Sequence, residues 1–165
     1  MTETPERAET PEVPRVFLVV VDETEEMRVA LRFACRRARH TGGRVALLHV
    51  IEPGDPQPFR QVEALMHAER RADAEALIQT LSADVVEWSG QLPVVHLRDG
   101  YAAAQLLTLI DEEPGISILV LAAGTGSEGP GPLISQLVGR LSGRLRVPIT
   151  VVPGGLSDAQ IDRLA

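Results

Sequence analysis

The chain has 165 residues, of which 44% are hydrophobic and 3% aromatic, and it carries a formal net charge of −7. A chain of this length can bury one sizeable core, which aliphatic side chains must fill here, as is usual for layered α/β proteins. The acidic balance argues against a nucleic-acid-binding surface, which needs a basic stripe, and all 16 basic residues are Arg, so every mechanism that requires a lysine is excluded.

The compartment follows from cysteine usage and from the start of the chain. Cys35 is the one cysteine, so no disulfide can form within the chain and a reducing compartment is the simplest setting. Residues 1–14 are acidic and rich in proline, and we expect a disordered tail there rather than a signal peptide. No apolar run approaches the roughly 20 residues that span a bilayer. We therefore expect a cytoplasmic protein without a membrane partner.

The first half of the chain alternates between aliphatic runs and amphipathic segments. Residues 15–21 (RVFLVVV) are a continuous aliphatic run, the pattern of a strand buried on both faces. Residues 25–41 repeat apolar side chains at the helical period, with Thr24 as the expected N-cap and two glycines at the end. A second buried strand is predicted over 44–51, and a long helix over 59–89 follows a loop.

The second half continues the alternation. We predict strands over 93–97, 116–121 and 148–152, helices over 101–113 and 133–145, and a short capped helix over 157–164. The order predicts an α/β fold with a five-stranded, mostly parallel sheet and helices on both faces. The expected domain covers 15–153, and 154–165 form a C-terminal tail. Ligands of such sheets bind beyond the carboxyl ends of the strands.

The loop over residues 122–132 (AAGTGSEGPGP) is the most informative segment for function. Its glycines permit positive φ and close approach to a ligand, and the helix after it offers unpaired N–H groups. Together these features suit a phosphate, although a tight strand-to-helix crossover would need the same residues. Glu128 lies inside the loop and would repel an anion.

Other side chains offer less specific signals. Asp22 ends the first strand, where its carboxylate could accept hydrogen bonds from a ribose or a base, or could serve the helix cap beside Thr24. Cys35 falls near the apolar stripe of the first helix and is interpreted as a core residue. The histidines lack metal-ligand spacing, so no metal site is expected. Four arginines form one broad face of the first helix, which we interpret as solvated, with a site for an acidic partner as the alternative: Arg28, Arg32, Arg36 and Arg39.

Two long stretches resemble the universal stress protein family. FLVVVDETEEMRVALRFACRRARHTGGRVALLHVIEP resembles the opening of these proteins, and ISILVLAAGTGSEGPGPLISQLVGRLSGRLRVPITVV resembles their glycine loop, helix and closing strand. Residues 98–100 resemble the turn after the third strand. The first stretch matches the family at Asp22, Thr24, His49 and Val50. The similarity covers roughly residues 15–152, so the chain is identified as a UspA-like member with a Rossmann-like fold of the adenine-nucleotide alpha-hydrolase type.

The resemblance implies a stress-response module that binds ATP or AMP. Asp22, Thr24 and Val50 would hold the nucleoside, and any Mg²⁺ would be bound mainly through phosphates. The phosphates would contact the loop and the helix after it, at Gly124, Gly126, Gly129, Gly131 and Ser135.

The family's ATP-binding pattern, G-x2-G-x9-G followed by Ser or Thr, can be placed in two registers. A literal count uses Gly126, Gly129 and Gly139, and puts Arg140 where the hydroxyl is expected. A count back from the closing strand puts Ser135 and Gln136 where the family has Gly-Ser.

Three other functions have to be compared with the features of the sequence. A module of the same family that binds no nucleotide is the main alternative, since family members commonly form homodimers through the last strand, here residues 148–152. A phosphoacceptor receiver domain is suggested by VVVDE, but the absence of lysine argues against it. Catalysis is not expected, because no base and nucleophile stand in a convincing arrangement.

Overall fold

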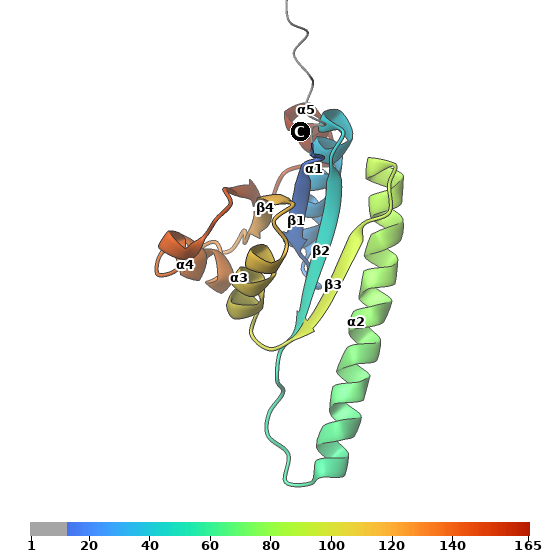
Figure 1. Ribbon diagram of the computed structural model, residues 1–165, viewed down its shortest axis with the longest axis vertical. Coiled ribbons are helices and arrows are strands. Elements are labelled where there is room, and N and C mark those ends of the chain that lie inside the picture. The colour runs from blue at the N-terminus through green and yellow to red at the C-terminus, as the bar shows by residue number, and fades with distance from the viewer. Residues whose placement is uncertain (1–12) are drawn as a thin grey trace, which may run out of the picture.

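The computed structural model describes residues 13–165 and contains one five-stranded sheet. Most of the predicted acidic tail, residues 1–12, lies outside the described residues. The strand order is β3-β2-β1-β4-β5, and every neighbouring pair is parallel (Figure 1). The strands are β1 (Val16–Val20), β2 (Arg44–Ile51), β3 (Val94–Asp99), β4 (Ile116–Ala123) and β5 (Ile149–Pro153). The predicted fold class is therefore confirmed.

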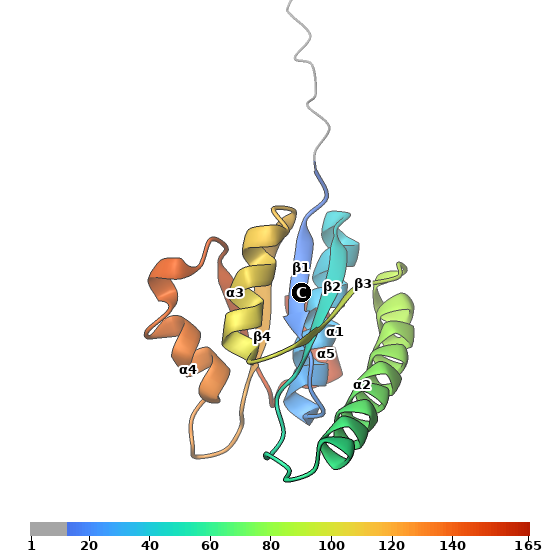
Figure 2. The same cartoon turned by 60° about the horizontal axis from the view of Figure 1, so that its bottom comes forward.

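Helices cover both faces of the sheet (Figure 2). α1 and α2 pack with one core cluster, and α3 and α4 pack with the other. The helices are α1 (Glu25–Thr41), α2 (Arg60–Ser89), α3 (Ala102–Glu112), α4 (Pro132–Val138) and α5 (Asp158–Leu164), with a 3₁₀ turn, η1, over Ser142–Arg144. Neighbouring residues of β1 show the two-sided burial, because Leu18 belongs to one cluster and Val19 to the other.

The bounds of α1 follow from its capping residues. The Thr24 hydroxyl accepts a hydrogen bond from the Met27 N–H (3.2 Å), and Gly42 ends the helix in the left-handed region, with φ of 68°. Cys35 lies in the buried stripe of this helix and is 0% exposed. Burial raises the pKa of its thiol to about 12. Thr24 as N-cap and Cys35 as a core residue are both confirmed.

The predicted helix over 133–145 is wrong in its second half. α4 ends at Val138, because Gly139 leaves the helical region with φ of −83° and ψ of −93°. Only η1 follows, and it contains Gly143. Two glycines within five positions raise the entropic cost of a continuous helix. The segment therefore crosses to β5 as a short helix and a turn.

The arginine face of α1 is not a solvated surface where α5 lies on it. The carboxylate of Asp162 accepts hydrogen bonds from Arg32 (3.1 and 3.0 Å) and Arg36 (2.9 and 3.1 Å). The acidic partner of these arginines is thus a residue of the same chain, which corrects the expectation of a solvated face. α5 begins with the predicted capping box at Ser157 and buries Ile161.

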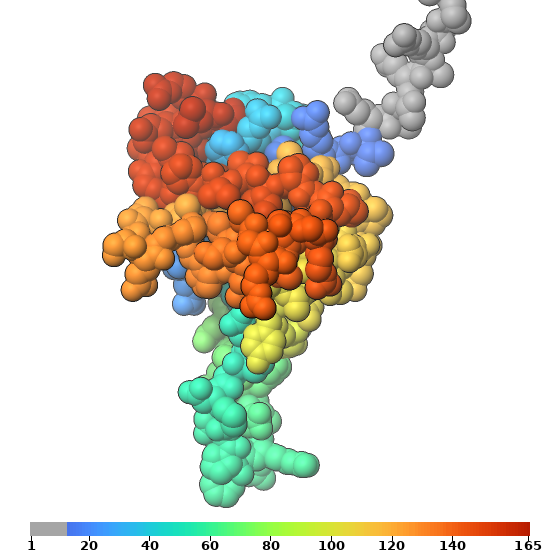
Figure 3. Space-filling model, turned by 90° about the vertical axis from the view of Figure 1, so that its left-hand side faces the viewer, coloured from blue at the N-terminus to red at the C-terminus, as the bar shows by residue number. Residues whose placement is uncertain are grey.

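The amino-terminal half of α2 and the loop before it project from the body of the molecule (Figure 3). In Figure 3 this part, drawn in green, lies below the packed helices and strands. Within residues 13–165 no helix is long and apolar enough to cross a membrane.

Candidate functional site

The candidate site lies where the order of the strands reverses. β1 is paired with β2 on one side and with β4 on the other. α1 leaves β1 toward one face of the sheet, while α3, which leads into β4, covers the opposite face. The two connections diverge and leave a crevice beyond the carboxyl ends of β1 and β4, the general place for ligands in such folds.

Three adjoining hollows line this edge. The β2 hollow has a volume of about 360 Å³ and is lined by Asp22, His49, Val50 and Arg70, among others. The central hollow, about 180 Å³, is lined by Asp22, Thr24, Ala122 and Gly131 among others. The loop hollow, about 660 Å³, is lined by Glu26, Gly124, Thr125, Gly126, Ser127, Glu128, Gly129, Gly131, Pro132 and Ser135. Each hollow shares a residue with the next, Asp22 first and then Gly131.

Every residue that the sequence proposed for nucleotide binding therefore lines one of these hollows. Asp22 and Val50 meet in the β2 hollow, and Asp22 and Thr24 meet in the central hollow. The loop residues gather in the third. The structure thus brings the predicted set together along one edge, and whether the set binds a ligand stays a prediction.

Asp22 is held in place by the turn that it begins. Its Oδ1 accepts hydrogen bonds from the N–H and the hydroxyl of Thr24, at 2.8 and 2.6 Å. The same hydroxyl accepts from the N–H of Met27. Thr24 is thus committed to the helix cap and to Asp22, while Oδ2 of the exposed Asp22 carboxylate has no hydrogen-bond partner among the described residues.

The main-chain groups of Val50 face the same opening. In β2, the Leu48 carbonyl accepts a hydrogen bond from the N–H of Val21, just after β1 (2.8 Å). The Ile51 carbonyl accepts one from the N–H of Gly100, just after β3 (3.1 Å). Because the main chain of a strand turns alternately to its two neighbours, Val50 faces the side that Leu48 faces. β1 ends at Val20, so the N–H and carbonyl of Val50 are directed past its end.

His49 adds a ring nitrogen to the β2 hollow. Its Nδ1 lies 2.9 Å from the Val21 carbonyl oxygen, which can only accept, so Nδ1 donates the proton. In the neutral ring Nε2 is then an acceptor. His49 belongs to the matched family stretch, but no feature of the sequence predicted that its ring would line the crevice.

The glycine loop uses several of its own polar groups. The Gly124 N–H donates to the Pro130 carbonyl (3.1 Å), and the Ser135 hydroxyl donates to the Gly131 carbonyl (3.0 Å). Gly129 and Gly131 adopt φ of 91° and 109°, which explains glycine at both positions. Ser135 lines the loop hollow, whereas Gly139 caps the far end of α4. Both registers therefore reach the crevice, the literal one through Gly126 and Gly129 and the other through Ser135, while Gly139 of the literal one lies outside the hollow.

Among the residues that the structure describes, the loop hollow is lined by acidic side chains and by no basic one. Glu26 and Glu128 are its charged lining residues. The pKa of the Glu26 carboxyl is lowered, mainly by its own main-chain N–H. Burial is the next largest effect and raises the pKa, while the hydroxyl and main chain of Thr125 lower it further. At the sequence level Glu26 indicated only a favourable charge at the start of α1, and its position against the loop was missed.

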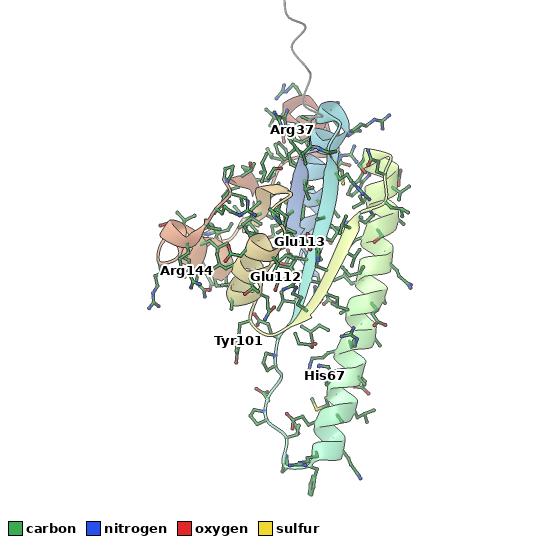
Figure 4. All side chains as sticks on the ribbon, viewed as in Figure 1. Arg37, His67, Tyr101, Glu112, Glu113 and Arg144 are labelled. Atoms are coloured by element: carbon green, nitrogen blue, oxygen red, sulfur yellow. The ribbon has the colours of Figure 1, made fainter. Side chains whose placement is uncertain are left out.

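Arg70 is the second residue that the sequence did not indicate. It projects from α2 between the β2 hollow and a neighbouring hollow of about 480 Å³, and its buried Nε has no hydrogen-bond partner among the described residues. His67, one turn earlier, reaches the end of β3, where its Nε2 lies 2.9 Å from the Asp99 carboxylate (Figure 4). Among residues 13–165 no group of three His, Cys, Asp or Glu side chains is placed to hold a metal ion.

Comparison with known proteins gives one consistent result. The model of the universal stress protein family matches residues 14–153, and a search of the curated proteins finds no matching sequence. The fold is similar to that of universal stress protein UspA from Lactobacillus plantarum, at 17% identity over 85% of this chain and 97% of that one, with a TM-score of 0.71.

Two further similar structures were determined with nucleotides. One is a universal stress protein in complex with cAMP, at 14% identity over 85% of this chain and 97% of that one, with a TM-score of 0.57. The other is the universal stress protein from Archaeoglobus fulgidus in complex with dAMP, at 19% identity over 84% of this chain and 96% of that one, with a TM-score of 0.55. At these identities the likeness shows a common fold.

Proposed function

The chain belongs to the universal stress protein family, and we propose that it is a stress-response module that binds an adenine nucleotide in the crevice beyond β1 and β4. The observation that carries the proposal is the convergence of the Asp22 carboxylate and the Val50 main chain on one hollow. An adenine ring presents a donor and an acceptor side by side, which a main-chain carbonyl and N–H can satisfy. A carboxylate oxygen suits the hydroxyls of a ribose.

The nucleotide complexes of two similar proteins support this choice of ligand. One of these proteins is in complex with cAMP and the other with dAMP, and both share the fold of this chain. Their ligands contain adenine and a single phosphate. The ligand we propose is therefore an adenine nucleotide such as AMP or ATP, with any Mg²⁺ bound through its phosphates.

Isothermal titration calorimetry with AMP tests the proposal. Asp22→Asn keeps the size of the side chain and removes the charge that a ribose would contact, so we expect the affinity for AMP to fall about tenfold or more. Asp111→Asn is the matched control, because it makes the same change at an exposed residue of α3 that lines none of the three hollows. The proposal is abandoned if wild-type protein shows no heat of binding with adenosine, AMP or ATP at millimolar concentration.

A homodimeric interaction module that binds no nucleotide is the second candidate, and the position of β5 favours it. β5 is the last strand of the sheet order and is paired with β4 on one side. Val151 in this strand is 40% exposed, so a second copy could cover both the free edge and this side chain. Analytical ultracentrifugation tests it: we expect a dimer that Val151→Lys converts to a monomer, and a monomeric wild-type protein would count against it.

Two further proposals concern the setting of this function. We place the protein in the cytoplasm, because its one cysteine is free and buried, as a reducing compartment allows. We also propose that it acts without catalysis. His49, the histidine of the crevice, bonds to a main-chain carbonyl and not to a hydroxyl that it could activate.

A further inference from the structure

We propose that the Glu26 carboxylate occupies the place of a phosphate in the loop hollow, so that the crevice binds adenosine and AMP in preference to ATP. This inference rests on the proposed function and names the class of ligand: an adenine nucleoside with few or no phosphates. It reverses the role that the sequence suggested for the glycine loop.

Thr125 and Gly154 hold the Glu26 side chain against the loop. Glu26 lies in the first turn of α1, and its Oε1 lies 3.4 Å from the Thr125 hydroxyl, which donates to it. On the other side, a Cβ added to Gly154 would lie 2.8 Å from the Cβ of Glu26 and 2.6 Å from the Ala123 carbonyl oxygen. A side chain at position 154 would therefore collide with Glu26. Because Gly154 has no Cβ, the aliphatic part of the Glu26 side chain can pack against it. Half-buried Glu26 is therefore positioned from two sides.

The groups that hold Glu26 are those that a phosphate would need. The carboxylate accepts a hydrogen bond from the Thr125 hydroxyl, and it faces the main-chain N–H groups of Glu26 itself and of Thr125, which lower its pKa. Main-chain N–H groups at the start of a helix and in a glycine loop are the usual donors to phosphate oxygens. An ionised carboxylate that already takes them leaves fewer for a ligand.

Charge acts in the same direction. Glu128 lines the same hollow, and within residues 13–165 no arginine or histidine of the lining offsets the two carboxylates. ATP has more negative charge than AMP, and adenosine has none, so repulsion grows with each phosphate. At the β2 end the carboxylates outnumber the Arg70 guanidinium and add to the same field: Asp22, Glu23, Glu52 and Asp73. An uncharged ribose, by contrast, gains hydrogen-bond acceptors from these side chains.

The experiment compares adenosine, AMP and ATP by calorimetry at low salt with a chelator present. For wild-type protein we expect ATP to bind about tenfold or more weakly than adenosine. The double variant E26Q/E128Q should raise the ratio of ATP affinity to adenosine affinity about three- to tenfold. The matched control E87Q/D111N removes two exposed carboxylates outside the crevice and should leave that ratio at its wild-type value.

Salt provides a readout that needs no variant. Because salt screens solvent-exposed charges, raising the salt concentration should reduce the difference in affinity between ATP and adenosine for wild-type protein. ATP binding as tightly as adenosine at low salt, or an equal rise of the ratio in the control variant, overturns the inference and leaves the proposed function standing. No binding of any of the three compounds overturns the proposed function itself.

Discussion

The attachment of α5 to α1 yields a prediction whose size can be worked out. Ile161 is 0% exposed and is the buried residue of this short helix. Ile161→Ala removes roughly three carbons at about 0.8 kcal/mol each, and the cavity left behind adds to the loss. The ion pairs of Asp162 with Arg32 and Arg36 are partly exposed, and solvent screening makes their contribution to holding the helix small. We therefore expect the free energy of unfolding to fall by about 2–4 kcal/mol.

Urea unfolding followed by circular dichroism measures this loss. Leu164→Ala is the control in the same helix: Leu164 is 56% exposed, and we expect a change within about 0.5 kcal/mol. The fluorescence of Trp88, the single tryptophan, reports on the same region, since the Arg32 guanidinium lies 5.4 Å from its ring centroid. A loss below about 1 kcal/mol for Ile161→Ala, or an equal loss for Leu164→Ala, would show that α5 is not anchored by Ile161.

Three smaller predictions concern α1. Thr24→Ala removes the acceptor for the Met27 N–H and should cost about 1 kcal/mol in urea unfolding, with Thr24→Ser close to wild type. Gly42→Ala meets no atom within 4 Å but must adopt φ of 68°, so a loss of about 1 kcal/mol is expected from backbone strain, and an unchanged midpoint would contradict it. Because the pKa of the Cys35 thiol is raised to about 12, a disulfide reagent at pH about 8 should modify it only after unfolding; rapid absorbance change with native protein would refute this. The same shift means that stability is lost as pH rises from the unfolded thiol's pKa of about 9 toward 12.

Much of the fold could be predicted because its strands are buried on both faces. Such strands require continuous aliphatic runs, and β1, β2 and β4 contain them. Helices separate these runs, and the first, α1, is bounded by a clear N-cap at Thr24 and by Gly42. The region after β4 has no such signal. Leu133, Leu137, Leu141 and Leu145 fit a helical period, yet Gly139 ends the helix because backbone entropy outweighs that pattern.

The site could be predicted only where it depends on strand ends. Asp22 follows β1 and Val50 lies near the carboxyl end of the adjacent parallel strand β2, so their meeting is a consequence of the topology. Glu26 and Arg70 lie on helices, and their approach to the crevice depends on how those helices are placed on the sheet. The stem of Glu26 is fixed by Gly154, more than a hundred residues later, a relation that no local pattern contains.

Gly154 links the crevice to the β5 edge, and this link limits which experiment can distinguish nucleotide binding from dimer formation. Gly154 follows β5, donates its N–H to the Ala123 carbonyl at the end of β4 (3.1 Å), and packs on Glu26. A variant that disrupts a dimer through β5 would therefore disturb the loop hollow even if assembly had no influence on the ligand. The two functions are therefore best distinguished with wild-type protein, by measuring AMP affinity at protein concentrations above and below the dissociation constant of the dimer. Binding and assembly must influence each other equally, so an AMP affinity that stays constant on dilution assigns the ligand to the protomer, and one that changes assigns it to the dimer.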